Sequence, residues 1–197
     1  SLERLRAVLD LAKKAGADAA EAVFANSRAL SVGVRKGETE TVERDETADL
    51  GLRVFVGRKQ AVVSISEFSR TTLERTVERA VAMAKLAPDD PYSSLADRAL
   101  LYRPVMQADI DLQLYDPTHL SAESLQQRAL DIEAAGLAVS PVLQSDAASA
   151  GYTQNMWHML TSDGFEGGHN TTLFFQSGRF IASDGDGNME RDGEGRS

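Results

Sequence analysis

The feature that most constrains the fold is an alternating apolar pattern that occurs on both sides of Gly57-Arg58. Apolar residues recur at every second position in both segments: Leu52, Val54 and Val56 before this pair, Val63 and Ile65 after it. Residues two apart point to the same face of a β-strand, and a glycine-containing pair suits a tight turn. The pattern therefore predicts an antiparallel hairpin formed by residues 50–56 and 60–66.

Helical spacing flanks this hairpin region. Apolar residues recur three or four positions apart in residues 2–12, before a stop at Gly16, and again in residues 73–84. Thr71 and Glu74 form a capping-box signature for the second of these helices. That helix must end before Pro88, because proline cannot continue a helix.

Between the first helix and the hairpin, the pattern changes to that of strands. Residues 20–35 contain two alternating apolar stretches, which predict two strands. Residues 38–46 are charged and rich in threonine, so that an edge strand and a solvated loop are both compatible with them.

The second half of the chain begins after a proline-rich stretch. Residues 88–119 hold four of the five prolines and show no strong periodicity, which predicts a connector on the surface. Ser121 is placed as the N-cap of a helix that runs to about Gly136, with Leu120 and Leu125 as a hydrophobic staple. Three strands are expected after this helix, in residues 142–145, 151–160 and 172–181.

This order of elements predicts an α+β fold, because the strands come in hairpin-like groups rather than in alternation with helices. We expect a two-layer N-terminal domain of helices on an antiparallel sheet in residues 1–88. A Pro-rich connector follows in residues 89–120. Residues 121–197 are expected to be the start of a second, strand-rich α+β domain that is incomplete, so that the chain is a fragment.

Composition and charge exclude several classes of function. The net charge is −9, and no cluster of Lys and Arg offers a surface for phosphate backbones, so nucleic-acid binding is not expected. There is no cysteine, which excludes disulfides and thiolate chemistry within the chain. No apolar run reaches about 18 residues, so no membrane span is expected. A cytoplasmic location is the default expectation.

The acidic segment 184–192 resembles a calcium loop only in part. Asp184, Asp186 and Asn188 occupy the first, third and fifth positions of an EF-hand loop. The sixth position, which needs glycine, is Met189, and the twelfth, which needs a bidentate glutamate, is Gly195. A tight Asp-Gly turn between two strands is therefore the favoured interpretation.

The sequence offers no complete active site. The three histidines do not have the spacing of a zinc motif, and no serine lies in a nucleophile elbow, so we predict no catalytic and no metal-binding residue. Arg53 and Arg191 lie within otherwise apolar or turn segments, and each can pair with a carboxylate or a peptide terminus. They are weak candidates for peptide binding, with a structural salt bridge as the favoured alternative. The segment 38–47 can act as a sheet edge that receives an extended peptide, or its charges can protect that edge.

Several segments in the right order resemble the TldD/PmbA family, formerly described as modulators of DNA gyrase. They cover nearly the whole chain: SVGVRKGE at 31–38, GLRVFV at 51–56, PDDPYSSLAD at 88–97, SDGFEG at 162–167 and DGDGNMERD at 184–192. The connector is more similar to the PmbA (TldE) branch, and the match ends at residues 192–195, where the family more often continues with an aromatic residue.

The resemblance implies the N-terminal portion of a longer cytosolic protein. It implies a heterodimeric zinc metalloprotease that acts on unfolded peptides, in the maturation of a peptide antibiotic or in antitoxin turnover. TldD-like members carry a His-Glu-x-x-x-His zinc motif that PmbA-like members lack, so zinc is expected in a TldD-like partner subunit and no cofactor in this chain.

Three hypotheses follow. The first is a non-catalytic subunit of such a protease, which binds its zinc-bearing paralogue and extended peptides and, as a fragment, can self-associate. The second is a stand-alone protein-binding regulatory module of the gyrase-modulator type, without protease activity. The third is an independent hydrolase that uses Asp, Glu or His.

Overall fold

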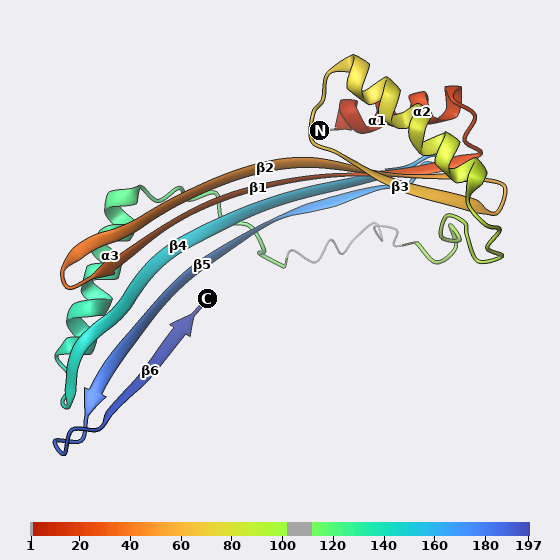
Figure 1. The fold of residues 1–197 in the computed structure, drawn as a ribbon. Helices are drawn as coiled ribbons and strands as arrows, with labels where there is room; N and C mark the ends of the chain where they lie inside the picture. The colour runs from red at the N-terminus through yellow and green to blue at the C-terminus, as the bar shows by residue number, and fades with distance from the viewer. Residues whose placement is uncertain (1, 102–111) are drawn as a thin grey trace. The chain divides into compact units, whose positions relative to one another are not determined.

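The computed structural model describes residues 2–101 and 112–197 and confirms the α+β class (Figure 1). Residues 102–111 of the predicted connector lie outside the described residues. The elements follow in the order α1 (Leu2–Lys14), β1 (Ala19–Arg35), β2 (Glu38–Val56), β3 (Lys59–Ile65), α2 (Arg70–Leu86), α3 (Ala122–Leu137), β4 (Val142–Thr161), β5 (Glu166–Ser183) and β6 (Met189–Arg196).

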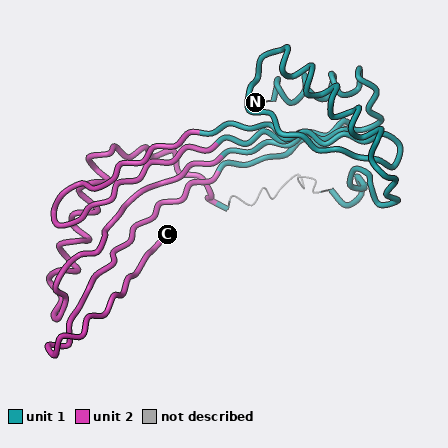
Figure 2. Tube along the Cα trace, in the orientation of Figure 1, with its two compact units in different colours: residues 1–26, 47–112, 156–170 teal, residues 27–46, 113–155, 171–197 magenta. Residues whose placement is uncertain are grey.

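The described strands form one sheet in the order β3-β2-β1-β4-β5-β6. The chain divides into two compact units, coloured separately in Figure 2: residues 1–26, 47–112 and 156–170 form unit 1, and residues 27–46, 113–155 and 171–197 form unit 2. Strands β1, β2, β4 and β5 each contribute residues to both units. The predicted boundaries at residues 88 and 121 stay a prediction.

Unit 1 contains α1 and α2, which cover one face of its part of the sheet (Figure 1). The hairpin prediction is confirmed, since β2 and β3 pair antiparallel from Leu50 opposite Ile65 to Val56 opposite Lys59. The alternating residues form the core with both helices; Leu5, Leu50 and Leu52 are fully buried. Burial of such a leucine side chain contributes roughly 2 kcal/mol, so the hairpin and the two helices stabilise one another.

Unit 2 has its own core beneath α3. Val32 and Val34 of β1 pack with Leu125 and Ala129 of α3 and with small residues of β4. The N-cap prediction for Ser121 is confirmed, because its side chain accepts a hydrogen bond from the backbone N–H of Ser124. Helix α3 thus begins where the sequence indicates and covers one face of the sheet in this unit.

A buried carboxylate ties α3 to the turn between β1 and β2. Glu133 is 3% exposed, and its Oε1 and Oε2 accept hydrogen bonds from the backbone N–H groups of Lys36 and Gly37 at 2.7 and 2.6 Å. Both turn residues have positive φ, 55° and 79°. Burial raises the pKa of Glu133, but the Ser145 hydroxyl and these two N–H groups outweigh it and hold the pKa below its ordinary value.

Three details differ from the prediction. The two strands expected at residues 142–145 and 151–160 form the single continuous strand β4. Residues 20–35 form the single strand β1 rather than two strands. Its polar middle is stabilised from both neighbours, because Asn26 Nδ2 donates to the Thr47 carbonyl and Ser27 Oγ donates to Asn155 Oδ1. Polar residues with cross-strand partners do not interrupt a strand.

The cap of α2 also differs, since Ser69 rather than Thr71 is the N-cap residue, with its side chain accepting from the Thr72 N–H. Helix α2 ends at Leu86, before Pro88, as predicted.

The segment 38–46 is resolved as a strand. It forms the first half of β2, and all of its residues are exposed. Among the described residues, β3 pairs only with Leu50–Val56, so the β3 side of this segment is a free edge.

Candidate functional site

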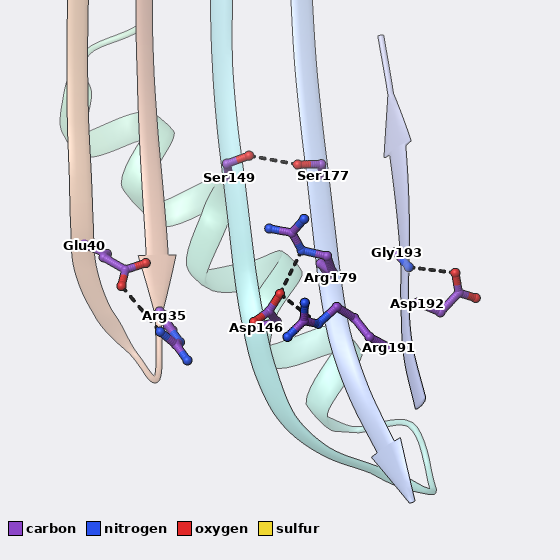
Figure 3. Close-up of polar contacts among 9 residues, drawn as sticks. All are labelled: Arg35, Glu40, Asp146, Ser149, Ser177, Arg179, Arg191, Asp192 and Gly193. Atoms are coloured by element: carbon purple, nitrogen blue, oxygen red, sulfur yellow. Dashed lines mark hydrogen bonds and ion pairs between the residues drawn. The ribbon is translucent and has the colours of Figure 1, made fainter. Parts of the chain in front are cut away.

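A carboxylate held by two arginines is the main charged cluster in unit 2 (Figure 3). Asp146 of β4 lies between Arg179 of β5 and Arg191 of β6. The Nε atoms of Arg179 and Arg191 lie 2.8 and 3.4 Å from the same oxygen, Oδ2 of Asp146. Two positive charges thus face one negative charge, which leaves a local excess of one positive charge on a chain with a net charge of −9.

Strand register brings these side chains together. In the β5–β6 pair, Arg179 lies opposite Gly193 and Ile181 lies opposite Arg191. Because directly opposite residues and residues two apart share a face, Arg179 and Arg191 are diagonal neighbours on one face. Gly193 leaves room beside Arg179, since a Cβ atom at this position would lie 3.3 Å from the Arg179 Cβ and Cγ.

The turn before β6 fixes this register. Asp184 Oδ1 accepts hydrogen bonds from the backbone N–H groups of Asp186 and Asn188 at 2.8 and 3.2 Å, and Oδ2 accepts from the Asn188 side chain. The Asn188 side chain, followed by these N–H groups, lowers the pKa of Asp184. Gly185 and Gly187 have positive φ, which glycine adopts without strain. The prediction of a turn between two strands is confirmed.

The guanidinium groups are open to solvent while their partner is not. The side chains of Arg179 and Arg191 are 57% and 60% exposed, against 16% for Asp146. Each ion pair uses Nε, whereas a guanidinium has five N–H donors. The exposed forks can therefore receive a further carboxylate.

Hydroxyl groups continue the polar character of this region. Ser149 Oγ and Ser177 Oγ lie 2.8 Å apart on β4 and β5, and Ser177 is two residues from Arg179 along the same strand (Figure 3). Arg35 and Glu40 form a further ion pair, at 3.7 Å, across the β1–β2 hairpin. The two serine hydroxyls supply hydrogen-bond donors and acceptors on β4 and β5, the strands that carry Asp146 and Arg179, whereas Arg35 and Glu40 lie at the β1–β2 hairpin.

A pocket of about 410 Å³ also lies within unit 2. Phe174 and Phe175 of β5, with Leu120 and Leu125, supply its apolar wall, and Arg128 of α3 adds a positive charge. A cavity of this size and composition suits an apolar side chain or a small ligand.

The two arginines singled out from the sequence lie in different units. Arg53 of unit 1 forms an ion pair with Glu21, which is 14% exposed. Its guanidinium carbon lies 5.3 Å from the centroid of the Phe55 ring. Both Arg53 and Arg191 thus have an intramolecular carboxylate partner, as in the salt-bridge alternative. Their part in peptide binding stays a prediction.

The sequence reasoning missed Asp146 and Arg179. Neither stands in a motif, and only the strand order places them beside Arg191. One sequence signal assigns Arg179 to a face of the sheet. Arg179 follows Phe175 and Ser177 at two-residue intervals, and residues two apart on a strand share a face.

The histidines do not assemble a metal site. His169 Nε2 accepts a hydrogen bond from Trp157 Nε1 at 2.9 Å, and the two rings meet edge to face. In residues 2–101 and 112–197, no group of three or more His, Cys, Asp or Glu side chains is arranged to hold a metal ion. The described residues therefore do not fit a zinc centre.

Within the same part of the chain, no helix has the length and apolar character needed to cross a membrane.

Comparison with known proteins places this geometry in a family. Residues 20–84 match the family description PmbA/TldA metallopeptidase domain 1, and residues 115–197 match the PmbA/TldA metallopeptidase central domain. The chain is 35% identical over 142 residues to the Metalloprotease PmbA homolog of Haemophilus influenzae, covering 72% of this chain and 30% of that protein. It is 29% identical over 191 residues to Metalloprotease PmbA of Escherichia coli O157:H7, covering 96% and 41%.

Solved structures show the same fold. A proposed modulator of DNA gyrase from Bacteroides thetaiotaomicron superposes with a TM-score of 0.87 at 20% identity, covering 98% of this chain and 44% of that one. TldE from Thermococcus kodakarensis superposes with a TM-score of 0.77 at 16% identity, covering 98% and 43%. The chain thus spans less than half the length of these relatives.

Proposed function

Because this chain belongs to the PmbA/TldD metallopeptidase family, we propose that it is the N-terminal portion of a non-catalytic, cytoplasmic subunit of a TldD/TldE-type zinc metalloprotease. The complete subunit binds a TldD-like paralogue, which carries the zinc and the His-Glu-x-x-x-His motif. Together they act on unfolded peptides, in peptide-antibiotic maturation or antitoxin turnover.

The relatives support this assignment. Both curated relatives carry the name metalloprotease PmbA, and their similarity extends over most of this chain. The resemblance of residues 88–97 to the PmbA branch favours the subunit type that lacks the zinc motif. The described residues do not fit a zinc centre, so no step of the hydrolysis is assigned to them.

The observation that carries the peptide-holding role is the free edge of β2 along residues 38–46. Among the described residues, β3 pairs with β2 only from Leu50 to Val56, which leaves the β3 side of this segment open. All residues of the segment are exposed. A strand edge presents unpaired N–H and C=O groups, which bind an extended main chain irrespective of its sequence. An unfolded peptide offers such a main chain, whereas a folded protein does not.

Reconstitution tests the proposal. The full-length protein and its zinc-bearing paralogue are purified separately, and cleavage of an unfolded peptide is followed by mass spectrometry for each alone and for the mixture. We expect cleavage only with both proteins present and its loss when the zinc is chelated. Cleavage by this protein alone would contradict the non-catalytic role.

The alternative is a stand-alone regulatory module that binds a partner protein without proteolysis. The name of the Bacteroides structure, a proposed modulator of DNA gyrase, favours it. A monomer that binds folded proteins and leaves peptides intact with every family paralogue would select this alternative.

A further inference from the structure

We infer that Asp186-Gly187 is a site of spontaneous covalent modification, at which the aspartate isomerises to isoaspartate through a succinimide ring. The sequence holds four Asp-Gly pairs: Asp163-Gly164, Asp184-Gly185, Asp186-Gly187 and Asp192-Gly193. All four have the same dipeptide chemistry, so the sequence alone does not rank them. The structure ranks them, because hydrogen bonds hold the reacting groups of the other three pairs.

The reaction needs no reactant other than water. The backbone nitrogen of the glycine attacks Cγ of the aspartic acid, a C–N bond forms, and the proton of the nitrogen leaves with the carboxyl hydroxyl as water. Water then opens the ring at either carbonyl, which returns aspartate or gives isoaspartate with one more carbon atom in the main chain. Glycine favours the attack, because it has no side chain in the way and adopts unusual backbone angles without strain.

The pair Asp184-Gly185 is protected by the turn that it forms. The Asp184 carboxylate accepts hydrogen bonds from the Asn188 side chain at 2.6 Å and from the backbone N–H groups of Asp186 and Asn188. These bonds stabilise the charged form and lower the pKa of Asp184, whereas the loss of water requires a protonated carboxyl group. The attacking Gly185 N–H donates to Ser183 Oγ at 3.2 Å. Both reacting groups of this pair are therefore held.

The first and last pairs are held by other contacts. Thr161 Oγ1 donates to the Asp163 carboxylate, and the Gly164 N–H donates to the Thr161 carbonyl at 3.1 Å. The Gly193 N–H donates to Asp192 Oδ1 at 2.8 Å (Figure 3), and both residues lie within the pairing of β5 with β6. A main chain fixed in a strand pair does not rotate to bring this nitrogen onto the carboxyl carbon.

The pair Asp186-Gly187 lies in the middle of the turn between β5 and β6. Both residues are exposed. Gly187 has a φ of 96°, and a Cβ atom at this position would meet no atom of the described residues within 4 Å beyond its chain neighbours. The N–H groups that Asp184 holds are those of Asp186 and Asn188. The attacking Gly187 nitrogen lies between them along the chain and is not one of the groups that Asp184 holds.

Peptide mapping by mass spectrometry tests the inference on the full-length protein, aged at neutral pH in heavy-oxygen water. Opening of the ring inserts one heavy oxygen at the residue that reacted, and an isoaspartyl methyltransferase labels the product independently. We expect label at Asp186 and about tenfold less at each of the other three pairs, the factor for one hydrogen bond to a charged group. A sample unfolded in urea is the reference, in which all four pairs should react at similar rates.

Variants relate the ranking to the turn. Asn188→Ala removes the amide donor from Asp184 and should raise the label at Asp184 about tenfold, with the label at Asp163 unchanged. Asp186→Glu keeps the charge but needs a larger ring, so it should abolish the label at this position. Asp192→Glu is the matched control, an exposed acid of the same segment, and should leave the label at Asp186 as in the wild type. Thermal melting checks that each variant is folded.

Two results overturn the inference. The first is a folded protein with no label at Asp186, or with as much label at Asp184 or Asp163 as at Asp186. The second is the same label at Asp184 in the wild type and in Asn188→Ala, because the turn would then not be the cause of the protection.

Discussion

Replacement of Glu133 by alanine tests how α3 is attached to the β1–β2 hairpin. The carboxylate accepts hydrogen bonds from Lys36 and Gly37 at 2.7 and 2.6 Å. A hydrogen bond to a charged group contributes about 1.5 to 3 kcal/mol. The turn residues are exposed, so water can satisfy the freed N–H groups, and the lower value applies. Two bonds at about 1.5 kcal/mol each give a loss of about 3 kcal/mol in the free energy of unfolding.

Urea denaturation of the full-length protein measures this loss, and hydrogen exchange at the Lys36 and Gly37 amides locates it. Glu133→Gln retains one acceptor oxygen and is expected to lose about half as much. The control is Asp131→Ala, which removes an exposed carboxylate from the same helix and should change stability by less than about 0.5 kcal/mol. A Glu133→Ala variant as stable as this control, with unchanged exchange at both amides, would refute the reasoning.

Three further predictions follow from the same structure. Folding lowers the pKa of Glu133 from its ordinary value of 4.5. The stabilisation by its carboxylate is therefore present above pH 4.5 and is lost as the pH falls through the folded-state pKa. The urea midpoints of the wild type and of Glu133→Gln should converge as the pH is lowered. Ser69→Ala removes the acceptor for the Thr72 N–H and should cost about 1 kcal/mol, measured by urea denaturation; an unchanged midpoint would contradict this role of Ser69. A Cβ at Gly136 would lie 2.0 Å from the Phe180 ring, so Gly136→Ala should lower the melting temperature although alanine favours helices. Adding Phe180→Leu to this variant should restore the melting temperature. A higher melting temperature for Gly136→Ala alone would argue against the contact.

Local features of the fold could be predicted because their causes are local. Gly57-Arg58 favours the turn of the β2–β3 hairpin, and Ser121 favours the start of α3 as its N-cap. The cap at Ser69 was misplaced by two residues because Thr71 with Glu74 offers the same side-chain chemistry. The single strand β1 was predicted as two, since the partners of Asn26 and Ser27 lie on other strands.

The candidate site could be predicted only in part, because its members come together through the sheet. Arg191 was recognisable as an arginine after a turn, but its relation to Asp146 depends on β5 lying between β4 and β6. A glutamate in a helix such as Glu133 is ordinarily expected to be exposed. The residues around it in the sequence do not indicate that it binds the turn between β1 and β2. Gly37 offered the signal that was missed, because a glycine after a strand implies positive φ and free N–H groups.

The proposed role as one subunit of a zinc metalloprotease is tested most directly by purification of the native, full-length protein from its own cells. Mass spectrometry identifies what is bound, and the zinc content of the purified material is measured. We predict a co-purifying paralogue with a His-Glu-x-x-x-His motif and about one zinc ion per pair, as a catalytic zinc site in one of two subunits requires. A zinc-free protein without such a paralogue would contradict the proposal and favour the regulatory module.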